Sequence, residues 1–463
     1  MSTAAKPALL AYRDKLVAVE PGGNQFIALE DRHGTPRQLF RTWTSPNLEF
    51  ATIFIGVLAV AVYGMTFRQA VAGIVVGTGL AAAAHYFLSA RGPVHGVPQM
   101  VLGRLAFGFT GNPLPSMLMT ITAGVGWFAT NSVSGAFALA ALLHIDALPA
   151  LVLIVAIQTG FGFFGHNLVQ AVERWTFPVL AVVFAITSIV ILSQSHLGAP
   201  ALSGGVGGPG GFLLTVGTAF GYTAGWTPYA ADFTRYLPPT VSPRRTGMYA
   251  ALGLFTSCAV LAIVGAASAT IGPAISDNPA QAFTAHLPVP LAAATLLAIA
   301  IGAIAANCMN IYSGAMAFVT IGITLGRSAR AVVTLVLGVL GFLIAWWALA
   351  DAADSYEEFL LIIAYWIGPW LGVVFADQYL RGGQSVARIL YDRSYTNWGG
   401  LTSFILGLVV SVLLFSHQER FVGFIAAAVP QLGDITFFAG FLIAGTSYLM
   451  LSRQKIATER RSS

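Results

Sequence analysis

Long apolar runs alternate with short polar connections along almost the whole chain. A helix needs about 20 predominantly apolar residues to cross a bilayer, so runs of this length predict transmembrane helices. We expect twelve such helices in one bundle. Their approximate ranges are 37–65, 68–90, 112–142, 148–166, 171–193, 212–236, 246–271, 289–316, 329–350, 357–379, 399–416 and 433–452.

Two of these runs contain residues that a plain membrane anchor would lack. The sixth run includes Gly-Trp-Thr-Pro at 225–228, and the first is interrupted by Trp-Thr-Ser-Pro-Asn at 43–47. Backbone groups that a break exposes within the bilayer need protein or water as partners. Paired broken helices in corresponding positions of two halves indicate a transporter site between them. Chance can also produce two such breaks in a chain with 22 prolines and 9 tryptophans.

The composition supports a membrane protein and gives its expected orientation. Hydrophobic residues make up 56% of the chain and charged residues 9%, whereas soluble domains carry about 25% charged residues. The net charge of +5 would suit nucleic acid, but all except Arg68 and Arg420 of the 23 Lys and Arg lie in alternate connections, starting with the N-terminal tail. By the positive-inside rule both termini are cytoplasmic, and we expect no nucleic-acid partner.

The sequence favours neither an enzyme nor a cofactor-binding protein. Cys258 and Cys308 both fall within apolar spans, where we expect reduced packing residues rather than a disulfide or a metal site. His-Glu-x-x-His, Gly-x-Ser-x-Gly and paired intramembrane aspartates are all missing from the sequence. The polar residues 1–34 read as a cytoplasmic tail without the apolar core of a signal peptide. A passive channel or a transport-like sensor remains a non-carrier alternative.

Glu49 lies just beyond the first break, about 20 Å along the helix from its predicted start and therefore near the membrane midplane. A carboxylate at this depth is costly and usually faces the bundle interior, which makes it a functional-site hypothesis. We expect a role in ion coupling or substrate contact. A structural pairing with another polar helix, or a position at the membrane interface, would also account for it.

Polar and aromatic residues also mark the third and eighth spans. Trp127 and Asn131 share one helix face because they are four residues apart, and together they offer a flat ring and a bidentate amide to a planar heterocycle. Asn307 and Asn310 share a face of the eighth span and need partners there. Either pair could instead form helix–helix contacts.

Asp232 and Arg235 lie at the cytoplasmic end of the sixth span, three residues apart. This spacing allows them to pair with each other on one helix face. We favour a structural or gating salt bridge over a proton carrier.

The motifs, taken in order, resemble the nucleobase:cation symporter family one, the purine and cytosine permeases, particularly its fungal members and their bacterial relatives. The resemblance rests on Gly126-Trp127-Phe128 with Asn131, on the segments 225–233 and 306–313, and on Tyr365-Trp366. It implies an all-α, leucine-transporter-like 5+5 inverted repeat with two extra helices. The ten-helix core would cover 35–380, with repeats at about 35–193 and 212–380, and 381–463 would hold two peripheral helices and a cytoplasmic C-terminus.

The resemblance also implies a function and a site. The function is secondary active import of a nucleobase, cytosine or a purine, across the cytoplasmic membrane by alternating access. The base would lie between aromatic side chains of the third and sixth helices, with amides around it. Carried onto this chain, these positions are Trp127 and Tyr222, with Trp226 as the alternative on the sixth helix, and the amides Asn131 and Asn307. The polar residues of the first break and of the eighth span add Asn47 and Asn310 to the expected substrate-binding residues.

One departure from the family pattern bears on the coupling ion. Sodium-coupled relatives place hydroxyl side chains on the eighth helix where this chain has Ile301 and Gly302, which offer no side-chain oxygen to a hard cation. We therefore expect proton coupling through Glu49 rather than sodium coupling. A sodium-coupled carrier, or a carrier of allantoin, a hydantoin or a vitamin-related pyrimidine, is the alternative.

Overall fold

Every expected span has a helical counterpart in the computed structural model, which describes residues 24–162, 166–202, 204–272, 276–322, 327–382, 386 and 388–462. Residues 1–23 of the predicted tail lie outside the described residues. The helices of the twelve spans are α2 (Gln38–Thr44) with α3 (Phe50–Ala61), α4 (Phe67–Ser89), α8 (Pro113–Ile121) with α9 (Phe128–Leu143), α10 (Ala147–Gly162), α11 (His166–Gln194), α12 (Gly208–Ala224) with α13 (Ala230–Thr234), α14 (Pro243–Ser268), α16 (Val289–Thr320), α17 (Arg327–Ala348), α18 (Ala352–Arg381), α19 (Trp398–Phe415) and α21 (Thr436–Ser462).

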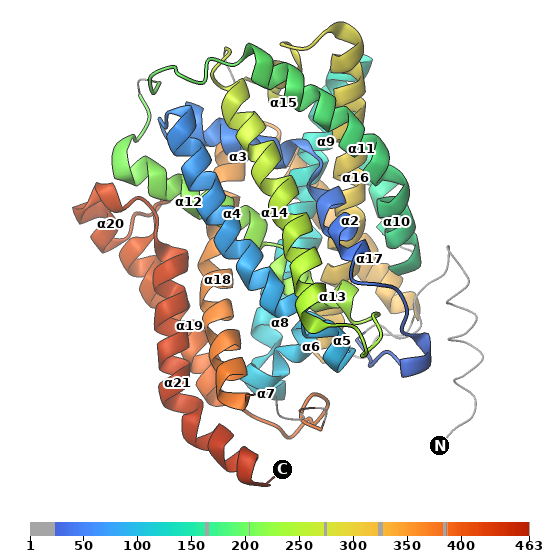
Figure 1. The fold of residues 1–463 in the computed structure, drawn as a ribbon, viewed down its shortest axis with the longest axis vertical. Coiled ribbons are helices and arrows are strands. Elements are labelled where there is room, and N and C mark those ends of the chain that lie inside the picture. The colour runs from blue at the N-terminus through green and yellow to red at the C-terminus, as the bar shows by residue number, and fades with distance from the viewer. Residues whose placement is uncertain are drawn as a thin grey trace.

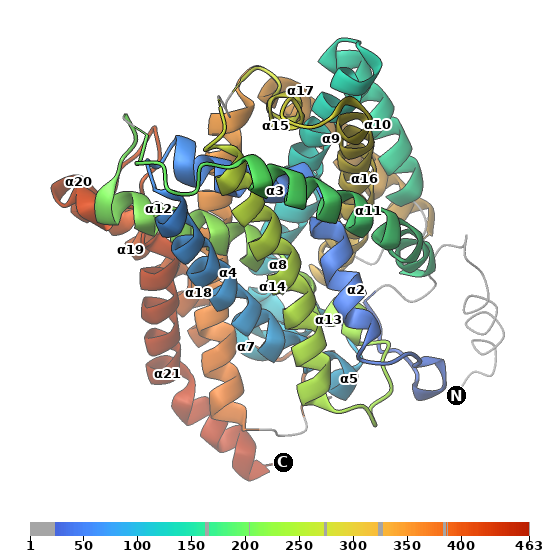
Figure 2. The ribbon, with the colours of Figure 1, turned by 45° about the horizontal axis from the view of Figure 1, so that its top comes forward.

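The helices form one bundle with a few short helices at its two ends (Figures 1 and 2). Helix α15 (Pro279–Thr284) lies at one end, called here the α15 face, and α5 (Gly92–His95), α6 (Gln99–Leu102) and α7 (Arg104–Gly111) lie toward the other, the α5 face. The short helices α5 to α7 connect the second span to the third. A further short helix, α20 (Phe424–Ala428), precedes α21.

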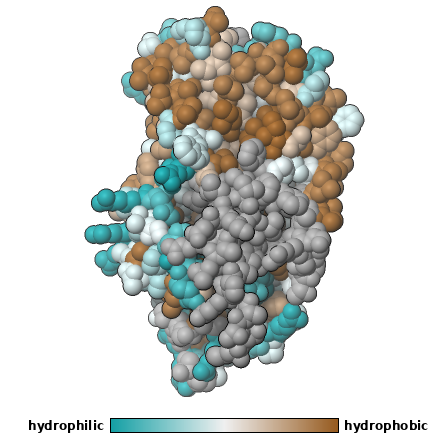
Figure 3. Space-filling view, turned by 90° about the vertical axis from the view of Figure 1, so that its right-hand side faces the viewer, coloured by the Kyte–Doolittle hydropathy of each residue, from teal (hydrophilic) through white to brown (hydrophobic). Residues whose placement is uncertain are grey.

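The outer surface of the bundle is apolar, as a bilayer requires. Seven described helices are each long and apolar enough to cross a membrane, and α2 with α3 form an eighth such span that is bent by 61°. On the side that carries α10, hydrophobic side chains cover the upper part of the surface (Figure 3). Exposed hydrophobic residues of the bundle include Val152 of α10 and Leu335 and Val339 of α17. The chain is therefore a multi-pass membrane protein.

Both predicted helix breaks are present. Between α2 and α3 the chain passes through a 3-10 turn, Ser45–Asn47, and Glu49 has an extended backbone and caps α3. Between α12 and α13 a second 3-10 turn spans Thr227–Tyr229. Each turn contains a proline near its start, where the missing N–H and the fixed φ end the preceding α-helix. The sequence pattern thus located both breaks correctly.

Glycines bring the broken helix α3 close to α14. A Cβ on Gly56 would lie 1.7 Å from the Ala262 carbonyl oxygen, and one on Gly265 would lie 1.8 Å from that of Ile53. Only residues without a side chain permit this approach, which is the usual way for small residues to join membrane helices. The contact therefore fixes α3 against α14.

The third span contains a feature that the sequence pattern did not predict. A π-helical turn, Thr122–Trp127, separates α8 from α9. Such turns insert a residue into the helix and often occur at functional sites. Here the turn ends at Trp127, so it sets the direction in which this side chain leaves the helix.

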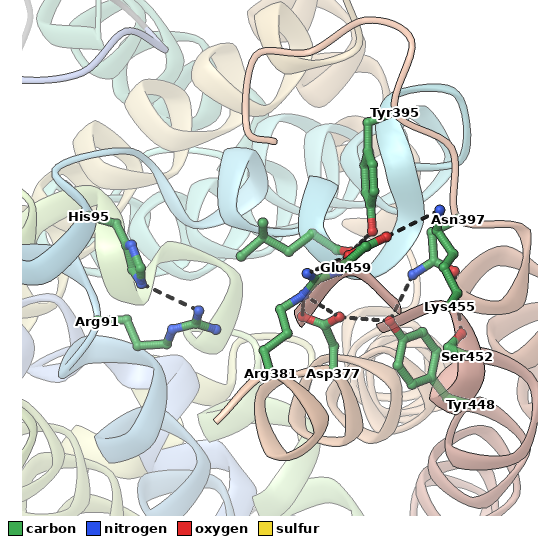
Figure 4. A network of polar contacts seen from close by, with 11 residues as sticks. Arg91, His95, Asp377, Arg381, Tyr395, Asn397, Tyr448, Ser452, Lys455 and Glu459 are labelled. Atoms are coloured by element: carbon green, nitrogen blue, oxygen red, sulfur yellow. Dashed lines mark hydrogen bonds and ion pairs between the residues drawn. The ribbon is translucent and has the colours of Figure 1, made fainter. Parts of the chain in front are cut away.

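The last two spans are held to the core by a buried polar network near the α5 face (Figure 4). Asp377 of α18 accepts hydrogen bonds from Arg381 (2.8 Å) and from the Tyr448 hydroxyl of α21 (2.7 Å). Arg381 also donates to the Leu105 carbonyl oxygen of α7 and pairs with Glu459 of α21, both at 3.0 Å. Sequence analysis expected two peripheral helices here and did not predict this network. It joins α7, α18 and α21 into one unit.

Candidate functional site

The two helix breaks meet in the centre of the bundle. The indole N–H of Trp226, at the second break, donates to the Asn47 side-chain oxygen of the first break at 2.8 Å. Asn47 in turn donates to the Trp43 carbonyl oxygen at 2.8 Å, which satisfies a backbone group that the break frees. Asn47, Trp226 and Trp43 are all buried. The breaks are therefore two halves of one structure, joined by side chains.

Glu49 lies at this junction and contacts three parts of the bundle. Its carboxylate accepts from the Ala51 backbone N–H (2.8 Å), the Tyr222 hydroxyl of α12 (3.1 Å) and the Ser134 hydroxyl of α9 (3.4 Å). The side chain is 1% exposed, and no ion pair within the described part of the chain involves it. Its surroundings thus offer hydrogen-bond donors but no compensating positive charge, at a point where both broken helices and α9 converge.

Aromatic rings form the wall beside Glu49. The rings of Trp127 and Tyr222 lie 5.3 Å apart, edge to face, and Phe359 of α18 packs on Trp127 at 5.1 Å. The structure brings the predicted aromatic pair together across α9 and α12. Gly225 lies directly beside the Trp127 indole, where a Cβ would be only 3.0 Å from the ring. A larger residue at 225 would therefore push the second break away from the third span.

Three of the four predicted asparagines form one cluster. The Asn307 side-chain oxygen accepts from the amide nitrogens of Asn131 (3.1 Å) and Asn310 (3.0 Å). The side-chain oxygen of Asn310 accepts from the Tyr229 hydroxyl of the second break at 2.8 Å. The cluster therefore links α9, α16 and the second break, and all of its side chains are buried.

Sequence analysis missed several residues that complete this centre. Gln158 of α10 accepts a hydrogen bond from the Asn307 amide at 2.8 Å, and Thr52 donates to the Asn47 carbonyl oxygen at 2.7 Å. His85 of α4 packs edge-on against Trp43, with ring centroids 4.2 Å apart. The sequence could have indicated Gln158, because it is an amide in an otherwise apolar helix and a buried amide needs a hydrogen-bond partner. The spacing of residues within one helix did not indicate that Thr52 or His85 belongs to the site.

A cavity of about 190 Å³ opens beside the site on the side of α15. Phe50 and Phe54 of α3, Tyr356 and Phe359 of α18, and Ser134 of α9 line it together with neighbouring side chains. Ser134 is both a wall of this cavity and a donor to Glu49. Ser134 therefore lies between the cavity and the buried carboxylate of Glu49.

The two predicted gate residues lie on the opposite side of the centre, near the α5 face. Asp232 of α13 accepts from the Gln99 backbone N–H at 2.9 Å. Arg235 donates to the Tyr312 hydroxyl of α16 at 3.2 Å and to the Gln25 carbonyl oxygen at 3.3 Å. Both side chains are buried. They join the second half of the broken sixth span to the α6 region, to α16 and to the segment before α2.

The α5 face is also closed by arginines in its connections. Arg104 of α7 donates to the carbonyl oxygens of Leu390 (3.0 Å) and Thr320 (3.1 Å), and Arg32 donates to that of Pro93 (2.7 Å). Burial lowers the pKa of the Arg104 and Arg32 guanidinium groups from the ordinary arginine value. Arginine remains charged at neutral pH, so these contacts are charge-assisted.

The eighth span contacts the first break at Gly302, one of the two positions that sequence analysis compared with sodium-coupled relatives. A Cβ on Gly302 would lie 2.3 Å from the Leu48 carbonyl oxygen and 3.0 Å from the Glu49 Cβ. The α16 backbone thus lies directly against the first break, without a side chain between them. In the described residues no three His, Cys, Asp or Glu side chains gather as a metal site.

Comparison with known proteins gives a consistent result across the full fold. A family model described as "Permease for cytosine/purines, uracil, thiamine, allantoin" matches residues 27–440. The putative purine-cytosine permease YxlA of Bacillus subtilis is 25% identical and covers 93% of this chain and 95% of its own. The purine-cytosine permease fcyB of Emericella nidulans is 29% identical, over 88% of this chain and 83% of its own.

Solved structures show the same architecture. Mhp1, a nucleobase-cation-symport-1 family transporter, in a closed conformation with bromovinylhydantoin bound, has a TM-score of 0.75 at 18% identity, over 96% of this chain and 97% of its own. Its inward-facing conformation gives a TM-score of 0.73 at 17% identity, over 95% of both chains. The expected leucine-transporter-like fold is thereby confirmed. With the family model matched across nearly all of the helical bundle, the chain belongs to the nucleobase:cation symporter family one, the permeases for cytosine, purines and related heterocycles.

Proposed function

We propose that this protein is a proton-coupled symporter that imports cytosine or a purine across the cytoplasmic membrane. The observation that carries the proposal is the convergence of both helix breaks, an aromatic pair and three asparagines on one buried centre. Family membership and the purine-cytosine permeases among the relatives support the substrate class. A carrier of this kind must bind the ring of the base, couple its transport to an ion and open alternately to the two sides of the membrane.

Ring binding fits the aromatic wall and the amide cluster. Trp127 and Tyr222 provide apolar surface for a planar base, which stacks on aromatic side chains regardless of its substituents. Asn131 lies one helical turn from Trp127 and offers an amide that can accept and donate in the plane of the ring. Asn307 and Asn310 support this amide, while Asn47 and Trp226 hold the two breaks beside it.

Proton coupling fits the surroundings of Glu49. Burying a carboxylate without a cation costs several kcal/mol, on the order of the penalty for other unpaired buried ions. A proton removes that charge, and Glu49 reaches both broken helices and α9 at once. Protonation there would change contacts on the helices that we propose line the substrate. Coupling of this kind is reciprocal, so the base and the proton each favour binding of the other.

The two ends of the bundle fit alternating access. The cavity beside Ser134 gives a route toward the centre from the α15 face, and Arg235 with Asp232 helps to cover the centre toward the α5 face. The excess of Lys and Arg on the side of the termini makes the α5 face cytoplasmic by the positive-inside rule. Import then requires the contacts of Arg235 and Asp232 to open after the α15 side has closed.

Uptake of radiolabelled cytosine, adenine and hypoxanthine by cells that express the protein tests the proposal. Concentrative uptake and counterflow of at least one base are expected, and both identify a carrier rather than a channel. Allantoin and a hydantoin belong in the panel, because relatives include an allantoin permease of Bacillus subtilis that is 23% identical. Transport of these compounds alone, or of none, would contradict the nucleobase assignment.

A further inference from the structure

Trp366 of α18 contacts the third span at a point outside the proposed substrate site. Its indole N–H donates to the Thr122 hydroxyl oxygen at 3.1 Å. Thr122 is the first residue of the π-helical turn that ends at Trp127. Trp366 and Thr122 are both buried, so bulk water competes little for this hydrogen bond.

A second residue of α18 contacts the other end of the same turn. The ring of Phe359 lies 5.1 Å from that of Trp127, and it also occupies the space beside Gly126, where a Cβ would overlap it. Phe359 and Trp366 are seven residues apart and therefore share one face of α18, two helical turns from each other. One face of α18 thus holds the π-helical turn both at its first residue and at its end.

The π-helical turn determines where Trp127 points. Such a turn inserts one residue into an α-helix, so its loss would rotate the residues on one side of it by about 100° relative to those on the other, the angle between successive α-helical residues. Trp127 would then no longer meet the ring of Tyr222, which now lies 5.3 Å away. The turn contains Gly124 and Gly126, and glycine is a weak helix former. Contacts from other helices therefore have to stabilise the turn.

The neighbouring residue Tyr365 holds α18 in place on another side. Its hydroxyl donates to Asp434, which precedes α21 and also accepts from the backbone N–H of His417 at 2.8 Å. Asp434 is buried, and His417 follows α19. Tyr365 thus joins α18 to the last two spans, while Trp366 joins it to the third span. The pair Tyr365-Trp366 therefore connects the outer helices with the turn before Trp127.

We propose that Trp366 is a positioning residue that, through Thr122, holds the π-helical turn so that Trp127 faces Tyr222 and can stack on the base. This inference rests on the proposed function and adds a residue outside the site that sets the affinity of the site. Trp366 itself touches no substrate. Its effect on base binding must therefore pass through Trp127.

The first test measures the KM and kcat of cytosine uptake, normalised to surface transporter. Trp366→Phe keeps an aromatic ring but removes the indole N–H, and it should raise KM about fivefold at an unchanged kcat, the size of one ordinary hydrogen bond. Thr122→Val removes the acceptor of the same bond and should have the same effect. Trp370→Phe is the matched control, because Trp370 is buried on the same helix and its indole N–H has no hydrogen-bond partner among the described residues. Its KM should stay within about twofold of the wild type.

A double-mutant cycle with Trp127 separates positioning from general packing. In a Trp127→Ala background there is no ring left to orient, so Trp366→Phe should cause no further rise in KM. A residue that only stabilises the fold would act independently of Trp127, and the two effects on KM would multiply.

The outcomes distinguish this inference from the proposed function. The inference is overturned if Trp366→Phe and Thr122→Val raise KM no more than Trp370→Phe does, or if the effect of Trp366→Phe multiplies with that of Trp127→Ala. If Trp366→Phe fails to reach the membrane, Thr122→Val decides by the same two criteria. A wild type that transports allantoin or a hydantoin but no nucleobase would contradict the proposed function, and the same KM comparison with that compound would still test the inference. A wild type that transports none of these compounds would overturn both.

Discussion

Replacement of Trp226 by Phe tests the direct link between the two broken helices. The substitution keeps an aromatic ring but removes the indole N–H that donates to Asn47 at 2.8 Å. The Asn47 oxygen is buried, so an acceptor there without a donor costs about 1–3 kcal/mol. This corresponds to a factor of about 5 to 150 in an equilibrium constant. If the bond forms only when the breaks close around the substrate, the factor appears as a higher KM for uptake.

Trp43→Phe is the matched control for this prediction. Trp43 is equally buried and loses the same atoms, but its indole N–H has no hydrogen-bond partner among the described residues. The assay is concentration-dependent uptake, normalised to surface transporter, with the thermal midpoint of the purified protein measured alongside. Trp226→Phe should raise KM at least about fivefold more than Trp43→Phe. Equal effects of the two variants would refute the role of the Trp226–Asn47 bond.

Three further predictions concern the walls of the site. Trp127→Ala should raise the KM for planar bases at least about fivefold without reducing surface expression, because a base loses its stacking partner; an unchanged KM would assign Trp127 to packing. Tyr222→Phe removes the hydroxyl bonded to Glu49, so base accumulation should fall while counterflow persists, and parallel loss of both would contradict a coupling role. Gly302→Ala places a methyl group 2.3 Å from the Leu48 carbonyl oxygen and should cost about 1–3 kcal/mol and most of the surface-normalised uptake. Gly79→Ala, whose nearest neighbour would be 3.9 Å away, is its control and should behave like the wild type.

Much of the fold could be predicted from local sequence. Apolar length determined the spans, and a proline next to tryptophan, threonine and other polar residues located the break in each of two spans. Proline alone was not sufficient, because α11 and α18 continue through Pro178 and Pro369. The structure also places Trp127 beside Tyr222 and Asn131 beside Asn307, four residues that the resemblance assigned to one site. That they bind a base stays a prediction.

The parts that could not be predicted depend on contacts between distant helices. Gln158 meets Asn307 across 149 residues of sequence, and Tyr448 meets Asp377 across 71. Spacing within one helix shows which residues share a face but not which helix that face meets. The π-helical turn before Trp127 has the same origin, since its glycines packed against α17 and α18 only become visible in the assembled bundle.

Proton-driven transport through Glu49 is tested most directly in proteoliposomes that contain the purified protein. A pH gradient, alkaline inside and without sodium, should drive accumulation of radiolabelled cytosine by the wild type, whereas a sodium gradient at equal pH should not. Glu49→Gln should still exchange cytosine in counterflow but no longer accumulate it in response to the pH gradient. Accumulation driven by sodium alone, or full pH-driven accumulation by Glu49→Gln, would contradict the assignment of Glu49 as the proton-coupling residue.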